Sequence, residues 1–462
     1  MRAYLASSIG AVCTAALVLP LSPPTSALAA PRVAAPQDAG AAAAGAGTRA
    51  SRAEGSPAVS AVRAVSGSTQ SLALTALASD RASGARPEEG AAQGLTSRDV
   101  RPFSLLGVVW DDAEAELHGT VQVRTRARKT HGWSGWQALD THNREHGADP
   151  GTTERDAAGV RGSTAPLWVG DSDGVEIRVR AAREPGTREH GGAGPGAEGA
   201  PREPLPHGLS LELVDPGKDP AGPAGRRATA LPALSRARTG AGPTGAGRAE
   251  AGRAGPRAAR PYIGPRPRIV TRGGWGADES LRERRFGYSR TLTAAFVHHS
   301  ATGNNYGCRQ SAAVLRAVYR YHVKSSGWRD IGYNFAVDKC GNIYEGRAGG
   351  VTKPVKGAHT LGLNANTMGI AVLGTYGGTN PSVAATTAVA RLTAWKLGLH
   401  RVDPRGKVTL ISSGNGKYKK GTKVGLRAIS GHRDGFNTDC PGTRLYGKLG
   451  TTRATAARYQ GR

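Results

Sequence analysis

The sequence predicts an α/β domain with a mixed central sheet flanked by helices, preceded by a small all-β, sandwich-like module and by segments without regular structure. Three observations lead to this architecture. Strand-like and helix-like periodicities interleave from residue 263 to the end, which is typical of α/β domains. Apolar residues alternate with period two between residues 99 and 215, which indicates half-buried strands. The remaining stretches consist mainly of small residues, proline and arginine.

The first 98 residues predict an export signal followed by an unstructured arm. Residues 1–30 contain the basic Arg2, an apolar run at 9–19 and the small-residue sequence Ala27-Leu28-Ala29, which together are typical of a cleaved signal peptide. The run is too short, and too interrupted by prolines, to span a membrane. Residues 31–98 carry few large apolar side chains, so we expect a disordered Ala/Gly/Arg-rich arm. Export predicts a secreted, extracellular or cell-wall-associated protein, where disulfides persist.

A β-rich accessory module is expected at residues 99–215, followed by a flexible linker at 216–262. Its predicted strands are the alternating segments 103–110, 121–124, 175–179 and 209–214. Residues 183–205 are rich in glycine, alanine and proline and are interpreted as a loop insertion. Trp133, Trp136 and Trp168 either stack on sugar rings or fill the core or an edge of the module, and the sequence leaves both open.

Positive charge is concentrated in the C-terminal domain. Residues 261–462 contain 32 Lys and Arg against 9 Asp and Glu, whereas the first 260 residues contain 30 and 26. Such a charge attracts polyanions. Motifs for base or phosphate readout are missing, so nucleic acid is not the expected partner. An anionic cell wall, with peptide carboxylates and teichoic acids, is the simpler partner.

The chemistry is concentrated in the stretch Gly431-His432-Arg433-Asp434-Gly435-Phe436-Asn437-Thr438-Asp439-Cys440-Pro441-Gly442. It places a histidine and a cysteine eight residues apart on a loop that ends in a Pro-Gly turn. Both side chains are zinc ligands, and a catalytic zinc needs a third ligand and an open position. The best candidate is the pair His298-His299, which ends an apolar run at 294–297. Zinc bound in this way hydrolyses an amide or an ester.

The elements of this domain are predicted in chain order. The sequence Arg272-Gly273-Gly274-Trp275 opens the domain, and 294–299 is a buried strand. A helix covers 311–324, with Ser311 as its N-cap. A second helix begins at Asn380-Pro381, with the proline at its first position, and ends at Gly398. The other predicted elements are a hairpin from 333–337 and 342–345, a strand at 368–373, a polar hairpin at 411–425, a strand at 426–430 and a helix at 443–457.

Four further motifs lie between His298 and His432. They are Gly327-Trp328-Arg329-Asp330-Ile331-Gly332-Tyr333-Asn334-Phe335, Ile343-Tyr344-Glu345-Gly346-Arg347, Gly357-Ala358-His359-Thr360 and Asn366-Thr367-Met368-Gly369-Ile370. Their order resembles the zinc amidases of the peptidoglycan recognition protein family, relatives of the phage-type amidase lysozymes. The resemblance covers roughly residues 266 to 450, within a domain expected at 263–462. It implies a Zn²⁺ cofactor held by His298, His432 and Cys440.

The resemblance also implies roles for other residues. Tyr333 matches the tyrosine next to the metal, and Thr438 stands where phage-type members carry a lysine; both are expected to be catalytic. The positions that line the peptide groove are matched by His322, Trp328, Arg347, His359 and Asn364. One departure is Gly346-Arg347-Ala348-Gly349, where many members have Gly-Arg-Gly-Trp. Because the Gly-Trp pair is associated with diaminopimelate-type stems, its absence leaves the third stem residue open.

Cys13 is removed with the predicted signal peptide, which leaves three cysteines. An odd number in an exported protein needs an explanation. Either Cys308 pairs with Cys340 and Cys440 is a metal thiolate, or Cys440 takes part in a disulfide and the zinc site is lost. The resemblance implies the first arrangement.

The expected function is therefore that of a secreted N-acetylmuramoyl-L-alanine amidase, a monomer that hydrolyses the bond between N-acetylmuramic acid and L-alanine in peptidoglycan. The alternative is a non-catalytic, peptidoglycan-binding recognition protein, since many members of the family have lost the zinc ligands. Such members commonly carry serine at the position of Cys440, so the cysteine favours the enzyme. Because zinc needs neutral imidazoles and a thiolate, we expect activity to fall at acid pH.

Overall fold

The structure is a computed structural model that describes residues 67–77, 92–183, 203–219, 229–239 and 262–462. The chain divides into two units, Met1–Val59 and Ser60–Arg462, and every described residue belongs to the second. The predicted signal peptide and most of the predicted arm, loop insertion and linker lie outside the described residues. Within the described ranges, no helix has the length and apolar character needed to cross a membrane.

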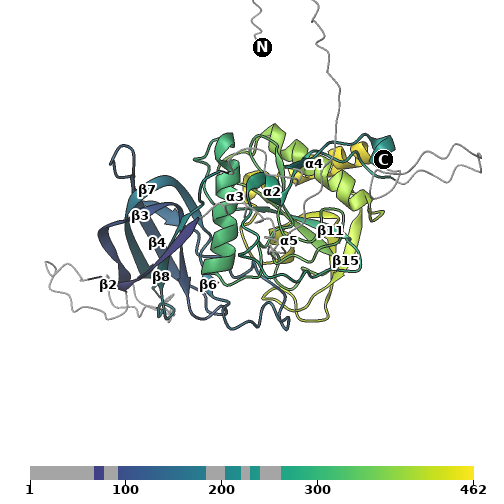
Figure 1. The fold of residues 1–462 in the computed structure, drawn as a ribbon. Helices are drawn as coiled ribbons and strands as arrows, with labels where there is room; N and C mark the ends of the chain where they lie inside the picture. Colours follow the sequence, from purple (N-terminus) through teal and green to yellow (C-terminus); the bar gives the residue numbers. More distant parts are fainter. Residues whose placement is uncertain (1–66, 78–91, 184–202, 220–228, 240–261) are drawn as a thin grey trace, which may run out of the picture. The chain divides into compact units, whose positions relative to one another are not determined.

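The N-terminal module is one antiparallel sheet, which confirms the predicted all-β module (Figure 1). Its long strands are β3 (Ala92–Trp110), β4 (Gly119–Ala127) and β7 (Leu167–Ala181). The shorter strands are β1 (Ser68–Ala73), β2 (Thr75–Ala76), β5 (Gln137–Leu139), β6 (Gly162–Ser163) and β8 (Ser210–Asp215). The order is β1-β8-β3-β7-β4-β5, with β2 and β6 paired to β3. Alternate residues of β3, β4, β7 and β8 form one apolar core.

The module begins earlier than composition indicated. Residues 68–76 and 92–98 form strands, so the prediction of a disordered arm is wrong for them. Strand β1 pairs with β8 along its full length, and Leu74 is buried in the core of the module. A segment with few apolar residues is ordered here because its backbone completes an existing sheet. Composition evaluates a segment alone and does not include that contribution.

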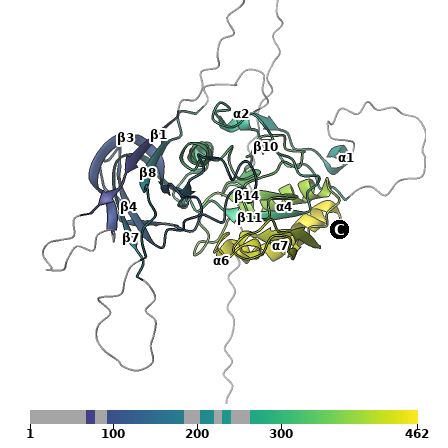
Figure 2. The same ribbon diagram turned by 90° about the horizontal axis from the view of Figure 1, so that it is seen from below.

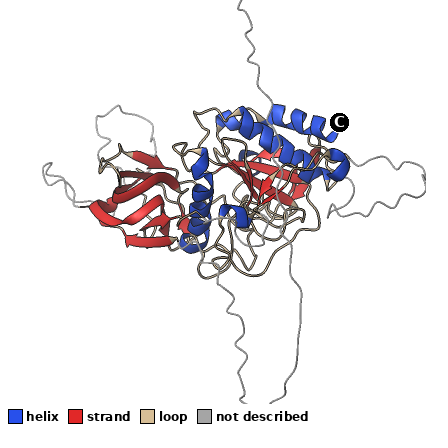
Figure 3. Ribbon diagram, turned by 45° about the horizontal axis from the view of Figure 1, so that its top comes forward, coloured by secondary structure: helices blue, strands red, loops and turns tan. Residues whose placement is uncertain are grey.

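The C-terminal domain has a mixed sheet with helices packed around it, as predicted (Figure 3). The strand order is β17-β11-β14-β12-β13-β10-β9. The central strands β11 (Ala294–His299) and β14 (Thr367–Val372) are parallel to each other and buried along their full length. The others are β9 (Ala230–Leu231), β10 (Ile269–Val270), β12 (Phe335–Val337), β13 (Ile343–Glu345) and β17 (Ile429–Gly431). Strand β9 belongs to the segment predicted as a linker, and it pairs with β10.

Helices cover both faces of this sheet. α4 (Val383–Gly398) and α7 (Leu449–Gln460) contact each other and pack on the face formed by alternate residues such as Val297 and Ile370 (Figure 2). α3 (Ser311–Arg320) packs on the other face, on residues that include Ala371. Because the register pairs His298 with Ala371, His298 faces away from the α4 side.

Most predicted elements occur, but several boundaries differ. α3 continues as one π-helical turn, η3 (Tyr321–Ser325), and Ser311 lies inside the helix, where it is buried. Ser382 caps α4 through a hydrogen bond from the Ala385 amide, so the helix begins after the predicted Pro381. The C-terminal helix is two helices, α6 (Thr443–Tyr446) and α7. The remaining short elements are α1 (Arg236–Thr239), α2 (Arg272–Trp275), η2 (Cys308–Gln310), α5 (His432–Gly435), β15 (Lys407–Ile411) and β16 (Lys423–Arg427).

The β-module contacts α3 and the π-helical turn η3 that follows it. The Tyr321 hydroxyl lies 3.3 Å from the Val108 carbonyl oxygen and 3.1 Å from that of Thr164. Trp168 is buried in an apolar cluster that includes residues of α3, so it belongs to the core rather than to a sugar-binding surface. Trp133 and Trp136 instead lie beside arginine side chains, with the Arg178 guanidinium 4.0 Å from the Trp136 ring centroid.

The hairpin between β12 and β13 is organised by the buried side chain of Asp338. Its carboxylate accepts hydrogen bonds from the backbone amides of Cys340 (3.0 Å) and Asn342 (2.9 Å), and also from the Asn342 side chain and the Tyr344 hydroxyl. Cys340 forms a disulfide with Cys308 across a Cα–Cα distance of 6.2 Å, which is the pairing that the resemblance implied.

We expect Asp338→Ala to lower the free energy of unfolding by about 2–4 kcal/mol, because four donors lose their acceptor at a buried position. Urea denaturation of the whole chain, followed by tryptophan fluorescence, measures this change. The matched control is Asp403→Ala in a half-buried turn, where the carboxylate accepts from the Arg405 amide and we expect a loss below about 1 kcal/mol. Equal losses in the two variants would show that Asp338 does not organise the hairpin.

Candidate metal centre

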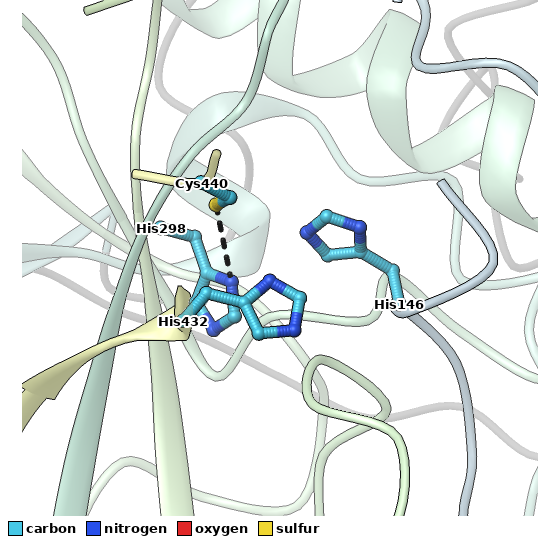
Figure 4. A group of neighbouring side chains, drawn as sticks. All are labelled: His146, His298, His432 and Cys440. Atoms are coloured by element: carbon cyan, nitrogen blue, oxygen red, sulfur yellow. Dashed lines mark hydrogen bonds between the residues drawn. The ribbon is translucent and has the colours of Figure 1, made fainter. Parts of the chain in front are cut away.

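Neighbouring parallel strands bring two histidines together at one edge of the sheet. His298 is the second-last residue of β11 and pairs with Ala371 of β14. His432 directly follows β17 as the first residue of α5. Strand β17 is parallel to β11, with Val297 opposite Gly431. Parallel strands end at the same edge, so the residues that follow this pair meet there. Cys440 reaches the same place from the loop after α5 (Figure 4).

A fourth side chain, His146, completes the cluster. The potential ligand atoms of His146, His298, His432 and Cys440 all lie within 4.8 Å of one another, and all four residues are buried. Figure 4 shows His146 approaching the other three from a different segment of the chain. It lies in the loop between β5 and β6 of the N-terminal module. It was not predicted from the sequence, because it lies outside residues 266 to 450, which the resemblance covers.

The geometry fits zinc. The Cys440 sulfur is 3.7 Å from Nδ1 of His298, and tetrahedral zinc holds a sulfur and a nitrogen about 3.6 Å apart, given the usual bond lengths. Both ring nitrogens of His146 and of His432, and Nε2 of His298, are buried without a hydrogen-bond partner. Buried polar atoms normally have partners. A metal ion bound in the cluster would give one nitrogen of each ring a partner.

Burial sets the protonation of the cluster. It lowers the pKa of His298 and of His432 well below the usual value, and the neighbouring histidines lower both further. The rings are therefore neutral at pH 7, the form that binds zinc. Burial raises the pKa of the Cys440 thiol well above its usual value. Without metal this group is a thiol at neutral pH, so zinc has to displace its proton.

The two predicted catalytic residues lie beside the cluster. The Tyr333 ring centroid is 5.4 Å from that of His298. Burial raises the pKa of Tyr333 well above its usual value, so its hydroxyl remains a donor. Thr438 accepts a hydrogen bond from the Cys440 amide (3.1 Å) and donates one to the Glu145 carboxylate (2.7 Å). Burial raises the pKa of Glu145 to about 7, and this bond opposes the shift.

The five predicted groove residues lie around the same centre. The rings of His322 and Trp328 stack with centroids 4.4 Å apart, and the His359 ring centroid is 5.3 Å from that of His298. Arg347 donates two hydrogen bonds to the Glu154 carboxylate, at 2.9 and 2.6 Å. Asn364 donates to Asp149 at 2.7 Å. Glu145, Asp149 and Glu154 were not predicted from the sequence, where their only signal is an acidic, histidine-containing loop.

The fold and the cluster together define a class of protein: an α/β domain with a candidate histidine–cysteine zinc site of the amidase type. Comparison with known families agrees. Residues 288–443 match the family described as N-acetylmuramoyl-L-alanine amidase, and residues 57–204 match one described as Rv3811 N-terminal galactose-binding domain-like.

The chain belongs to the peptidoglycan-recognition protein family. It is 34% identical over 185 residues to peptidoglycan-recognition protein SC2 of Drosophila simulans. The matched region is 40% of this chain and 85% of that protein. It is also 34% identical over 191 residues to the N-acetylmuramoyl-L-alanine amidase of Homo sapiens, covering 40% of this chain and 28% of that protein. These matches confirm the family that the sequence motifs indicated.

Similar solved structures come from the same family. Wild-type Drosophila PGRP-LB is similar over 40% of this chain and 92% of that chain, with 25% identity and a TM-score of 0.32. Peptidoglycan recognition protein-LE was solved in complex with tracheal cytotoxin, a monomeric diaminopimelic acid-type peptidoglycan. It is similar over 40% of this chain and 92% of that chain, with 27% identity and a TM-score of 0.31.

We predict that zinc binding to the metal-free chain at pH 7 releases about one proton, which comes from Cys440, because the histidines are already neutral. Falling pH favours the thiol over the thiolate, so the apparent zinc affinity should fall about tenfold for each pH unit below the thiol pKa. Titration calorimetry in buffers with different ionisation enthalpies measures the proton release. Cys440→Ser should bind zinc more weakly and release no proton; an unchanged release in this variant would exclude the thiolate as a ligand.

Proposed function

We propose that this chain is a secreted zinc-dependent N-acetylmuramoyl-L-alanine amidase that hydrolyses the amide bond between N-acetylmuramic acid and L-alanine in peptidoglycan. The observation that carries the proposal is the buried set of His298, His432 and Cys440, with ring nitrogens that lack partners, in a domain that matches the amidase family. Two side chains predicted to be catalytic lie directly beside this set.

The chain's own residues would divide the work of hydrolysis. When bound, zinc supplies a Lewis acid that polarises an amide carbonyl and lowers the pKa of water. Neutral His298 and His432 can bind it without losing a proton, and Cys440 contributes the one negative ligand. The Tyr333 hydroxyl, held protonated by burial, would donate to the oxyanion that develops on the carbonyl. Thr438 can hold a polar group of the substrate with the hydroxyl that now donates to Glu145.

The expected partner is peptidoglycan, through both stem peptide and glycan. Arg347 and Asn364 offer donors suited to the carboxylates of a stem peptide. The excess of 32 basic over 9 acidic residues in 261–462 would also attract anionic wall polymers. The Cys308–Cys340 disulfide agrees with an exported protein, because such bonds persist in oxidising surroundings.

The binding-only alternative has one structural argument. With His146, the cluster offers four ligands, and closed four-ligand sets are typical of structural zinc sites. A recognition protein could keep such a site for stability and bind peptidoglycan without cleaving it. The two functions therefore differ in whether muramic acid ends appear, not in whether metal or cell wall is bound.

We expect Tyr333→Phe to retain about one zinc per chain and to lower kcat by roughly 10²–10³, because only the oxyanion donor is removed. Release of stem peptides from purified muropeptides, detected by mass spectrometry, measures the rate, and atomic absorption measures the zinc content. Cys440→Ser should lose both zinc and activity.

Tyr344→Phe is the matched control. Tyr344 is also a buried tyrosine of this domain, but its hydroxyl donates to Asp338 rather than facing the cluster, so kcat should stay close to that of the parent. If both the parent and His146→Ala bind zinc and muropeptides and yet neither releases stem peptide, the amidase proposal is wrong and the binding-only function stands.

A further inference from the structure

We propose that the loop between β5 and β6, residues 140–161, is an intramolecular pseudosubstrate that holds the amidase in a latent state, with His146 as the fourth ligand of the metal centre. This inference rests on the proposed function and adds its regulation. The loop belongs to the β-module at both ends but crosses the C-terminal domain. Its side chains contact the residues expected to bind metal and substrate.

His146 occupies the position that a reactant would need. Its ring centroid lies 4.6 Å from that of His432 and 5.4 Å from that of His298, and both of its ring nitrogens are buried without a partner. Catalytic zinc keeps an open position, whereas four protein ligands close the site. A metal ion held by all four side chains would therefore be unable to accept water or a substrate carbonyl.

Acidic side chains of the same loop occupy the groove donors. Glu154 forms a two-bond ion pair with Arg347, at 2.9 and 2.6 Å, and both side chains are largely buried, at 14% and 8% exposure. Asp149 accepts from the Asn364 side chain at 2.7 Å and lies 3.2 Å from the Lys356 ammonium group. These carboxylates take the donors that a stem peptide would use, which is the chemistry of a substrate mimic.

The backbone of the loop is bound as well. The Leu361 amide donates to the Glu145 carbonyl at 2.9 Å, and the Asn364 side chain donates to that of Gly147 at 2.8 Å. Residues 145–149 are buried as a continuous run, whereas 156–159 are exposed. A loop that is bound by side chains, backbone and a metal ligand at once fills the groove. Little room remains beside it, since the cavity next to His146, Tyr333 and Cys440 measures about 10 Å³.

The loop is also held by ion pairs with the β-module. Arg144 donates to Glu114 and to Glu116 at 2.9 and 2.8 Å, and Arg155 forms an ion pair with Glu114. Both arginines flank the inserted residues, and both acids belong to the β-module. Substrate or metal access therefore requires the loop to leave the groove, by competition from stem-peptide carboxylates or after cleavage in the exposed stretch 156–159.

The test compares the whole chain with His146→Ala, using His142→Ala as the matched control. His142 is a histidine of the same loop, but its side chain is 80% exposed and is absent from the cluster. We expect His146→Ala to bind zinc more weakly and yet to release stem peptides roughly tenfold faster, because the open state is no longer a minor population. His142→Ala should match the parent in both measurements.

Cobalt substitution gives a readout that does not depend on activity. In the Co²⁺ form of the parent, an added hydroxamate should leave the visible absorption unchanged, since four protein ligands close the site. In His146→Ala it should shift the spectrum. An identical spectrum and identical hydroxamate response in the two proteins would overturn the assignment of His146 as a ligand. Parallel loss of zinc and of activity would overturn latency, because His146 would then be a required ligand.

A second variant tests the groove without changing the metal centre. Glu154→Gln removes the ion pair with Arg347, and we expect free L-alanyl-γ-D-glutamyl tripeptides, of both diaminopimelate and lysine type, to bind about tenfold more tightly. Unchanged affinity for both would contradict the pseudosubstrate. If peptide binding and the cobalt spectra change as expected while no variant releases stem peptides, the loop closes the site and only the amidase function fails.

Discussion

The parallel pairing of β17 with β11 determines where the chemistry of this protein can occur. It places His298 and His432 at the same edge of the sheet, and the loop after α5 then returns Cys440 to them. The core on the opposite face, with α4 and α7, buries one side of β11. The same burial that stabilises the strand keeps the histidines neutral and the thiol protonated. Fold stability and readiness for metal therefore have one origin.

Local patterns were sufficient for much of this domain. Strand β11 has the predicted bounds, because an apolar run ending in two histidines fits a buried strand. The hairpin that carries Cys340 was also anticipated. The start of α4 was predicted wrongly because Pro381 and Ser382 both favour a helix start. The hydrogen bond from the Ala385 amide to the Ser382 side chain decides between them.

Long-range contacts could not be predicted from the sequence. Strand β1 is ordered by β8, which lies more than a hundred residues further along the chain, and composition alone predicted an arm. His146 was not predicted for the same reason. Its loop has no periodicity, and its position depends on the contact of the β-module with η3 through groups such as Tyr321. A pattern within one segment describes what that segment can do alone. It does not identify the surface against which the segment will fold.

Charge explains why an acidic loop is a suitable occupant of this groove. The domain's strong positive charge attracts carboxylates from a distance, and the buried donors of Arg347 and Asn364 would be costly to leave without acceptors. Because the loop itself covers these donors, it has to supply acceptors for them, whereas in an open groove water would do so. Glu154 and Asp149 satisfy them in the same chain, and His146 does the same for the metal centre. If the groove binds stem peptides as proposed, the need for acceptors that favours their carboxylates also stabilises its closed state, and any ligand that opens it has to offer equivalent acceptors.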